Sequence, residues 1–375
     1  MLFCVVDKSL GEGHSFVDGM LRGALRSFFP EIMIVYGKRA VGGECSMWDS
    51  RCIEAPFSRS GFGRVGIALF SVWVFFKRIG RGSHTVFIRN DVVTLTLFVL
   101  LKRLSGVRFR LLFQNSFPHE RYSSSRLGRG VATLLMKFSV SGCDRVIVVD
   151  GNAIPRIRAY SSCVPIGVIP LCCDFPAGEV SKKLRHEGEV IFLYAGTFSR
   201  LRKLDVLIRA FYAVRSRGGF RLVLIGGGIE ELAVDKVMMD ICNIMIREGS
   251  LIMPGRLARD EVARFMAEAD VGLNLIPPLD VYMESSSTKL GEYLSQGLPV
   301  ISSIGVPYHH KIHGYADVGW LVQFSESAIE DLILKIIEGG HEGLRCFHER
   351  CIKLVEDHLR YRLYTSEFVG EIPHV

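Results

Sequence analysis

Short apolar runs alternate with amphipathic stretches through the first half of the chain, a pattern typical of a doubly wound parallel sheet. The apolar runs that predict strands lie at residues 2–6, 32–36, 85–88, 109–113, 146–149 and 167–170. A polar loop at residues 8–14 is followed by an amphipathic stretch that predicts a helix over residues 16–28. The first half is therefore predicted to be an α/β domain.

The same alternation begins again at residue 190, after a polar segment at residues 176–189 that is typical of an interdomain linker. Strands are predicted over residues 190–194, 222–225, 271–275, 300–302 and 318–322. Helices are predicted over residues 259–267 and 326–337, and as a long amphipathic tail over residues 344–369. The chain is thus predicted to contain two domains of the same class.

Length and composition agree with two domains that bury large apolar cores. The chain has 375 residues, of which 49% are hydrophobic. Its ten cysteines show no CxxC pair or zinc-ligand spacing, and Cys172 and Cys173 are adjacent, which favours buried thiols in a reducing compartment. The apolar start at residues 1–6 is too short for a signal peptide, so we expect a cytoplasmic protein.

Charge is divided unevenly between the two halves. Residues 1–180 carry 23 Lys and Arg against 13 Asp and Glu, a net charge of +10, whereas residues 181–375 carry 23 against 26, a net charge of −3. The basic half contains two segments, residues 64–81 and 121–137, in which apolar residues such as Trp73 stand beside Lys and Arg. They fit helices that lie on an anionic membrane surface, although core helices of an α/β domain have the same pattern. An anionic membrane is therefore a candidate partner, with the protein peripheral at its inner face, and nucleic acid is not expected.

The main candidate site begins at Glu284, which is followed eight residues later by Glu292. A helix is predicted to begin between them, with Ser287 or Thr288 as its N-cap, to contain Glu292 and to end at Gly297. The first turn of a helix has unpaired N–H groups and the positive end of the helix dipole, so an anion could bind there. Lys289 adds a cation and Glu292 a carboxylate. This set can hold a nucleotide diphosphate and its ribose, whereas two glutamates at this spacing also occur by chance on a solvated helix.

A second cluster of candidate residues follows the strand predicted at residues 190–194. The turn begins with Gly196 and Thr197 and continues with three cations: Arg200, Arg202 and Lys203. Cations between the end of a strand and the start of a helix can hold the phosphates of an anionic ligand. Glycine turns follow later strands, and the candidates there are Gly226, Gly227 and Arg256. A solvated basic turn, with glycines needed only for the turns, is the other interpretation.

Together these elements resemble the E-x7-E retaining glycosyltransferases of family 4, which have the GT-B fold. Both glutamates, the following Gly-Leu-Pro-Val and the lysine are present in this chain. The resemblance implies an α/β protein with two Rossmann-like doubly wound parallel-sheet domains facing a cleft. It implies an acceptor-side domain at residues 1–175, with the C-terminal helix of residues 344–375 packing back on it. The donor-binding domain would occupy residues 189–340.

The resemblance also implies a role for each candidate. In the family, the first glutamate contacts the donor sugar and the second binds the ribose hydroxyls, which are the roles expected of Glu284 and Glu292. Lys203 fits the place of the family's phosphate-binding lysine, and Arg202 is its neighbour, so both are expected to act in catalysis. The threonine at the start of this turn stands where the family usually has arginine. Arg200 is therefore the candidate for the second phosphate contact.

On the first domain, the loop after the first strand contains Gly11, Gly13 and His14. Loops that follow parallel strands line the ligand-binding edge of an open α/β sheet, and in the family this loop faces the active cleft. The loop lacks the third glycine of a dinucleotide fingerprint, which argues against a nicotinamide cofactor. His119 is a further candidate, and residues 114–116 stand closest to the place of the family's sugar-contacting histidine or glutamate. Either loop histidine could instead be simply solvated.

The sequence thus predicts a retaining, hexosyltransferase-like glycosyltransferase that moves a sugar from a nucleotide sugar to a glycan or lipid-linked acceptor. Such an activity belongs to bacterial-type surface polysaccharide or glycolipid synthesis. No Asp-x-Asp metal motif occurs at a useful place, so we expect no metal and no other cofactor. A sugar-nucleotide epimerase, which needs no acceptor, and a catalytically silent nucleotide-binding subunit are the alternatives.

Overall fold

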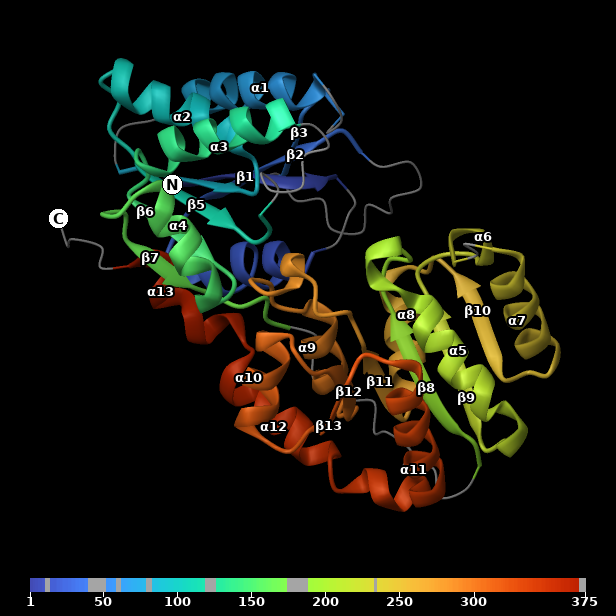
Figure 1. Ribbon diagram of the computed structural model, residues 1–375. Helices are drawn as coiled ribbons and strands as arrows, with labels where there is room; N and C mark the ends of the chain where they lie inside the picture. Colours follow the sequence, from blue (N-terminus) through green and yellow to red (C-terminus); the bar gives the residue numbers. More distant parts are fainter. Residues whose placement is uncertain are drawn as a thin grey trace. The chain divides into compact units, whose positions relative to one another are not determined.

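The computed structural model describes residues 1–10, 14–39, 52–58, 62–78, 83–118, 126–173, 188–232 and 235–370. The chain divides into two units, each built on its own parallel sheet (Figure 1). The first unit contains Met1–Cys172, Glu284–Ser286 and Tyr361–Val375, and the second contains Cys173–Met283 and Ser287–Arg360.

The sheet of the first unit has the strand order β3-β2-β1-β4-β5-β6-β7, and all neighbours are parallel. Its strands are β1 (Leu2–Ser9), β2 (Ile32–Gly37), β3 (Cys52–Glu54), β4 (Thr85–Arg89), β5 (Arg110–Asn115), β6 (Arg145–Val148) and β7 (Ile166–Val168). Residues 2–6, 32–36 and 86–89 are buried without interruption, because both faces of the sheet are covered. The strands predicted in this half all form, whereas the three-residue β3 was not predicted.

Alternate residues of the central strand enter two different cores. Phe3 and Val5 point to the face covered by α1 (Gly63–Arg78), α2 (Val92–Leu104), α3 (Arg126–Val140) and α4 (Ile154–Tyr160). Leu2, Cys4 and Val6 point to the face covered by η1 (Phe16–Leu21), η2 (Ala24–Ser27), η8 (Tyr361–Tyr364) and α13 (Thr365–Val369). The period of two along a strand places these residues on opposite faces, and the doubly wound sheet is confirmed.

The second unit repeats this architecture with the strand order β10-β9-β8-β11-β12-β13, again all parallel. Its strands are β8 (Val190–Ala195), β9 (Phe220–Ile225), β10 (Leu251–Gly255), β11 (Val271–Asn274), β12 (Val300–Ser303) and β13 (Gly319–Val322). One face packs against α5 (Leu204–Val214), α6 (Ile229–Leu232), α7 (Lys236–Arg247) and α11 (Glu326–Arg345). The other packs against α8 (Arg259–Glu268), α9 (Thr288–Ser295), α10 (Pro307–Tyr315) and α12 (His348–His358).

The single helix predicted over residues 16–28 is wrong, because the segment forms two short pieces. The π-helical turn η1 ends before Gly23, whose backbone is not helical (φ −100°, ψ −90°), and the 3-10 helix η2 follows. A Cβ atom at Gly23 would lie 2.4 Å from the carbonyl oxygen of Gly19. Glycine therefore permits a tight turn that ends the predicted helix early.

The helical tail predicted over residues 344–369 is also divided. The helix α11 continues to Arg345 with a break at Gly340, where φ is +55°, and α12, η8 and α13 follow as separate elements. Of the tail, only the part from Tyr361 onward belongs to the first unit, where Tyr361 and Phe368 enter the core beneath β4 and β5. The helix α12 belongs to the second unit and packs against α9.

Candidate active site

Both sheets contain a point at which the strand order reverses, and open α/β sheets bind ligands at such points, outside the carboxyl ends of the strands. In the second unit the reversal lies between β8 and β11. In the first unit it lies between β1 and β4. The polar residues that follow these strands form two candidate sites, one in each unit.

A chain of hydrogen bonds fixes the N-terminus of α9. Ser287 is the N-cap: its Oγ accepts from the backbone N–H of the third residue of the helix at 3.3 Å and donates to Asn274 Oδ1 at 2.8 Å. Asn274 ends β11, and its Nδ2 donates to His309 Nε2 at 2.8 Å. The other ring nitrogen of His309 lies 3.0 Å from the carbonyl oxygen of Ser303. Of the two predicted N-caps, Ser287 has this role, and Thr288 is the first residue of the helix.

A buried tyrosine holds α9 against β8 and β11. Tyr293 Oη accepts from the Ala195 N–H at 2.7 Å, and the tyrosine has no exposed surface. Its ring packs on Gly272, where a Cβ atom would lie 2.6 Å from the ring. Burial raises the pKa of Tyr293, so its hydroxyl stays protonated. The start of α9 therefore has a fixed place beside the carboxyl ends of these strands.

The second glutamate of the motif is paired on this helix. Glu292 is 6% exposed, and its Oε2 lies 2.5 Å from Lys289 Nζ, one turn away. Because the lysine side chain is 38% exposed, the pair contributes orientation more than stability. The first turn and a half of α9 thus present an N-cap, a cation and a buried carboxylate.

The turn after β8 carries cations without carboxylate partners. Among the described residues, no carboxylate pairs with Arg200, Arg202 or Lys203. Lys203 joins η5 (Arg200–Arg202) to α5 in the left-handed conformation (φ 46°, ψ 50°). This conformation costs a residue with a Cβ atom about 1 kcal/mol. Backbone strain of this kind is concentrated at functional sites.

Arg202 faces the aromatic residues around this turn. Its guanidinium carbon lies 5.1 Å from the ring centroid of Tyr282. Burial raises the pKa of Tyr194 to about 12, and the charge of Arg202 opposes that rise. Tyr194 Oη donates to the carbonyl oxygen of Thr197 at 3.3 Å, which fixes the start of the turn. Arg202 also lowers the pKa of His309, although burial is the main cause of that shift.

Two glycine turns lie next to this cationic turn. Gly226 has a φ of 129°, and a Cβ atom there would lie 2.1 Å from the carbonyl oxygen of Gly196, so only glycine lets the two turns approach. Gly227 packs on the ring of a neighbouring phenylalanine. Arg256 donates from Nη2 to Glu231 Oε2 at 2.6 Å, so its charge is already compensated.

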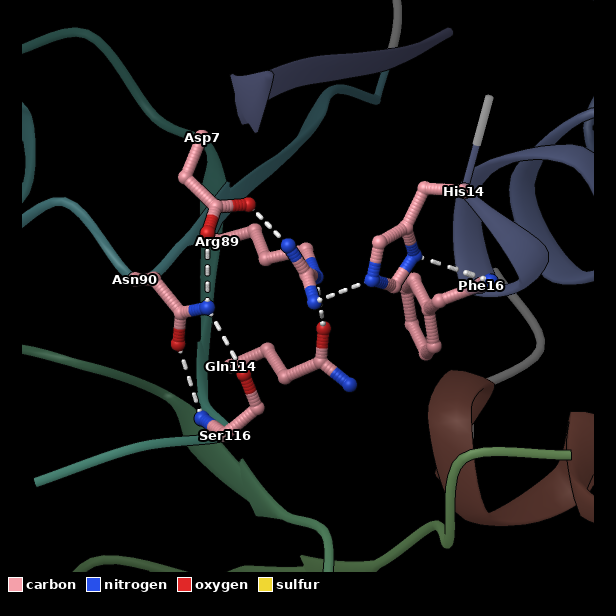
Figure 2. Close-up of polar contacts among 7 residues, drawn as sticks. All are labelled: Asp7, His14, Phe16, Arg89, Asn90, Gln114 and Ser116. Atoms are coloured by element: carbon pink, nitrogen blue, oxygen red, sulfur yellow. Dashed lines mark hydrogen bonds and ion pairs between the residues drawn. The ribbon is translucent and has the colours of Figure 1, made fainter. Parts of the chain in front are cut away.

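In the first unit, a hydrogen-bonded cluster lies at the carboxyl ends of β1, β4 and β5 (Figure 2). Arg89 is 3% exposed, pairs with Asp7 and donates from Nε to Gln114 Oε1 at 3.0 Å. Asn90 has a left-handed φ of 54° and donates from Nδ2 to Asp7 Oδ2 at 2.9 Å and to Ser116 Oγ at 2.6 Å. Both oxygens of Asp7 therefore accept from the end of β4.

His14 extends this cluster. Its Nε2 lies 3.0 Å from Arg89 Nη2, and its Nδ1 lies 3.1 Å from the Phe16 backbone nitrogen (Figure 2). The Arg89 guanidinium and the Phe16 N–H can only donate hydrogen bonds. A neutral imidazole accepts at only one of its two nitrogens, so only one of these two hydrogen bonds can form at a time. A protonated imidazole could form neither. The other candidates of this edge lie outside the described residues: Gly11, Gly13 and His119.

The first glutamate of the motif is held by an arginine that sequence analysis did not identify. Arg156 is 6% exposed, and it donates from Nε to Glu284 Oε2 at 2.5 Å and from Nη2 to Asn115 Oδ1 at 2.7 Å. Ser286 Oγ accepts from the Leu171 N–H at 2.9 Å. No local motif marks Arg156, because 128 residues separate it from its carboxylate partner. Glu284 itself lies before α9, within the first unit.

Over the described parts of the chain, no group of three or more His, Cys, Asp and Glu side chains could hold a metal ion. Within the same residues, no helix is both long and apolar enough to cross a bilayer.

Two parallel-sheet α/β units, each with polar residues gathered where its strand order reverses, have the GT-B fold of solved glycosyltransferases. Residues 189–338 match the family model "Glycosyl transferases group 1". The second unit is thus similar to that family, and the predicted fold and enzyme class, a glycosyltransferase, are confirmed. A search of curated protein sequences finds no match.

Solved structures with the same fold extend over nearly the whole chain. Sucrose-phosphate synthase from Thermosynechococcus elongatus is 15% identical with a TM-score of 0.73, and 98% of each chain is covered. Anabaena HepE, solved with UDP and glucose, is 12% identical with a TM-score of 0.69, and 99% of each chain is covered. The lipopolysaccharide outer core galactosyltransferase WaaB is 15% identical with a TM-score of 0.63, covering 99% of this chain and 100% of that one. At these identities the similarity establishes the fold.

Proposed function

We propose that this glycosyltransferase is a metal-independent enzyme of the retaining E-x7-E type that takes a sugar from a nucleotide sugar bound by the second unit. The acceptor is a hydroxyl group of a glycan or lipid-linked sugar, as in surface polysaccharide or glycolipid synthesis. The name of WaaB supports this class of acceptor. The main observation that supports this proposal is the positive charge at the point where the strand order of the second sheet reverses. Arg202 and Lys203 lie there and lack carboxylate partners among the described residues.

The chemistry follows from where charge develops. When the bond between the sugar and the diphosphate breaks, negative charge grows on the phosphate oxygens and positive charge grows on the sugar. Arg202, Lys203 and the N–H groups at the start of α9 are fixed before the reaction, so they stabilise the growing negative charge most strongly in the transition state. Glu292 would accept a hydrogen bond from a ribose hydroxyl. Glu284 is the carboxylate expected to contact the donor sugar.

A thermal-shift panel of nucleotides and nucleotide sugars tests the donor site, because a ligand stabilises the folded protein that binds it. Uridine nucleotides are the first candidates, since HepE was solved with UDP and glucose. The Glu292→Gln variant should bind the selected nucleotide more weakly by about 1–3 kcal/mol, the value of a charge-assisted hydrogen bond. The matched control is Glu338→Gln, which changes an exposed glutamate of α11. Equal affinities of the two variants would exclude the ribose role.

Product analysis separates the transferase from its alternatives. A transferase releases nucleoside diphosphate faster when an acceptor glycan is added. An epimerase would convert the free nucleotide sugar without an acceptor, and a silent subunit would bind the nucleotide without turnover. Activity that is unchanged after chelation of divalent metals is expected, and loss of turnover on chelation would contradict the metal-independent mechanism.

We further propose that the outer face of α1, α2 and α3 rests on an anionic membrane. The helix α1 places Val74 and Phe75 in the core, whereas Leu69 and Trp73 are 58% and 52% exposed. Exposed apolar residues continue on α3, where Leu134 is 69% exposed. The helix α2 packs between α1 and α3, so the three helices form one layer on this face of the sheet (Figure 1). In this proposal the inner side of the helices belongs to the core and the outer side to the membrane surface.

Cations stand beside this apolar face. Lys77 Nζ lies 4.1 Å from the ring centroid of Trp73, and Arg78 and Arg103 lie at the ends of α1 and α2, where Lys102 is paired with Asp144. Each Lys or Arg near an anionic surface contributes about 1 kcal/mol to the binding free energy, and salt screens this attraction. Exposed apolar side chains rimmed by cations fit the boundary between lipid headgroups and acyl chains.

Sedimentation with phosphatidylserine vesicles tests this attachment. The protein should pellet with the vesicles at low ionic strength and be released by salt, and Trp73→Ser should weaken the attachment. The matched control is Val237→Ser, at an exposed apolar residue of α7 in the second unit. A protein that stays in the supernatant at low salt would show that this face does not bind membranes.

A further inference from the structure

The carboxyl edge of the first sheet carries a buried cation whose charge is already balanced (Figure 2). Arg89 pairs with Asp7, and their side chains are 3% and 21% exposed. The carboxylate is therefore the partner that a ligand can reach. Gln114 accepts from Arg89, and its Nε2 is buried without a partner among the described residues.

The second arginine of this edge is balanced in the same way. Arg156 pairs with Glu284, and their side chains are 4% and 10% exposed, so the carboxylate is again the more accessible partner. The two arginines and two carboxylates add no net positive charge. The edge of the second unit differs, because Arg202 there has no carboxylate partner within the described residues.

We propose that the first unit accepts an uncharged, hydroxyl-bearing sugar and rejects phosphorylated sugars, and that Asp7 determines this specificity. The inference rests on the proposed function and on the expectation that the first unit is the acceptor-side domain. It defines the acceptor's chemical class at Asp7, Asn90 and Ser116.

These groups suit hydroxyls rather than phosphate. A sugar hydroxyl can donate to the carboxylate of Asp7 and accept from the hydroxyl of Ser116, whose Oγ already accepts from Asn90. Both N–H bonds of the Asn90 amide are used, one by Asp7 and one by Ser116, so Asn90 holds these two groups in place. A phosphate would bring its negative charge next to Asp7. To reach Arg89 it would have to displace Asp7 and leave that carboxylate without its arginine, which is strongly unfavourable in a partly buried place. Specificity therefore comes from a repulsive group as well as from attractive ones.

The Asp7→Asn variant tests the inference, because it removes the repulsion and leaves Arg89 without its partner. Glucose 6-phosphate is the probe, titrated by calorimetry with the second unit saturated by the nucleotide that the thermal-shift panel selects. We expect a gain of about tenfold in affinity for the probe over wild type, the effect of one charge-assisted hydrogen bond. The double variant Asp7→Asn/Arg89→Gln is the matched control and should lose the gain.

Two results would overturn the inference: saturable binding of glucose 6-phosphate by wild type, or no gain in a folded Asp7→Asn protein. If thermal unfolding shows that the Asp7→Asn protein does not fold, acceptor-stimulated nucleotide release by the wild-type protein tests the inference instead. Nucleotide release that is accelerated by unphosphorylated glycans alone supports the inference, and release accelerated by sugar phosphates refutes it. The proposed function is tested separately in the same titrations: it fails if the wild-type protein does not bind the nucleotide.

Discussion

Acid should destabilise the second unit through His309, which supports the N-cap of α9. Asn274 Nδ2 can only donate, so His309 Nε2 must accept, and Nδ1 carries the proton and donates to the Ser303 carbonyl. This neutral tautomer satisfies both hydrogen bonds. A second proton on Nε2 would break the bond to Asn274, whose Oδ1 accepts from Ser287.

The size of the effect follows from the pKa of His309. This pKa is lowered from 6.5 to about 4, mainly by burial; the hydrogen bond to Ser303 opposes the shift, and the charges of His313, His310 and Arg202 add to it. In the unfolded chain His309 takes up a proton near its ordinary pKa of 6.5. The contribution of neutral His309 to stability is therefore fully present above that pH and is lost as the pH drops toward 4. Linkage gives a loss of about 2 kcal/mol between about pH 7 and about pH 5.

Urea denaturation at these two pH values measures the loss. In His309→Gln the neutral amide cannot be protonated, so this part of the pH dependence should disappear, whatever the variant costs in absolute stability. The companion variant is His313→Gln: burial lowers the pKa of His313 to about 4 as well, so this variant should remove a separate, similar part of the pH dependence, although no described hydrogen bond links His313 to the α9 cap. The reasoning is refuted if His309→Gln keeps the pH dependence of wild type, or if NMR titration shows that His309 is protonated above pH 6.

Two further variants separate binding from catalysis. Lys203→Asn removes the charge and keeps a residue that tolerates the left-handed conformation, so turnover should fall at least as much as donor affinity, measured by steady-state kinetics and calorimetry. A rise in KM with an unchanged kcat would assign Lys203 to binding alone. Arg156→Lys keeps the charge but not the two-directional hydrogen bonding to Glu284 and Asn115, so kcat should fall while nucleotide affinity stays the same. A parallel loss of nucleotide affinity would contradict a positioning role for Arg156.

The strands were predictable because their signal is local. In a sheet covered on both faces every strand residue is buried, so a run such as 190–195 is apolar without interruption. The N-cap of α9 and the end of β11 follow from equally local rules. The break of the helix predicted over residues 16–28 did not follow, because the close approach of Gly23 to Gly19 depends on the packing of the turn and not on periodicity.

The pairs that fix the site were not predictable, because sequence spacing carries no information about them. His309 is 35 residues from Asn274, and Arg156 is 128 residues from Glu284. Each pair meets only because parallel strands bring their carboxyl ends to one edge of a sheet. A histidine in the sequence Tyr-His-His-Lys gives no sign that one ring is buried and accepts from an amide.

The E-x7-E spacing does not place the two glutamates on one face of a helix. Because α9 begins at Thr288, Glu284 lies outside the helix, and no helical geometry relates it to Glu292. What fixes Glu284 is the buried guanidinium of Arg156, while Glu292 is fixed by its place on a helix held by Tyr293. The two glutamates therefore belong to different units. For this reason, substitutions of Arg156 and Tyr293 should affect different steps, sugar transfer in the first case and nucleotide binding in the second.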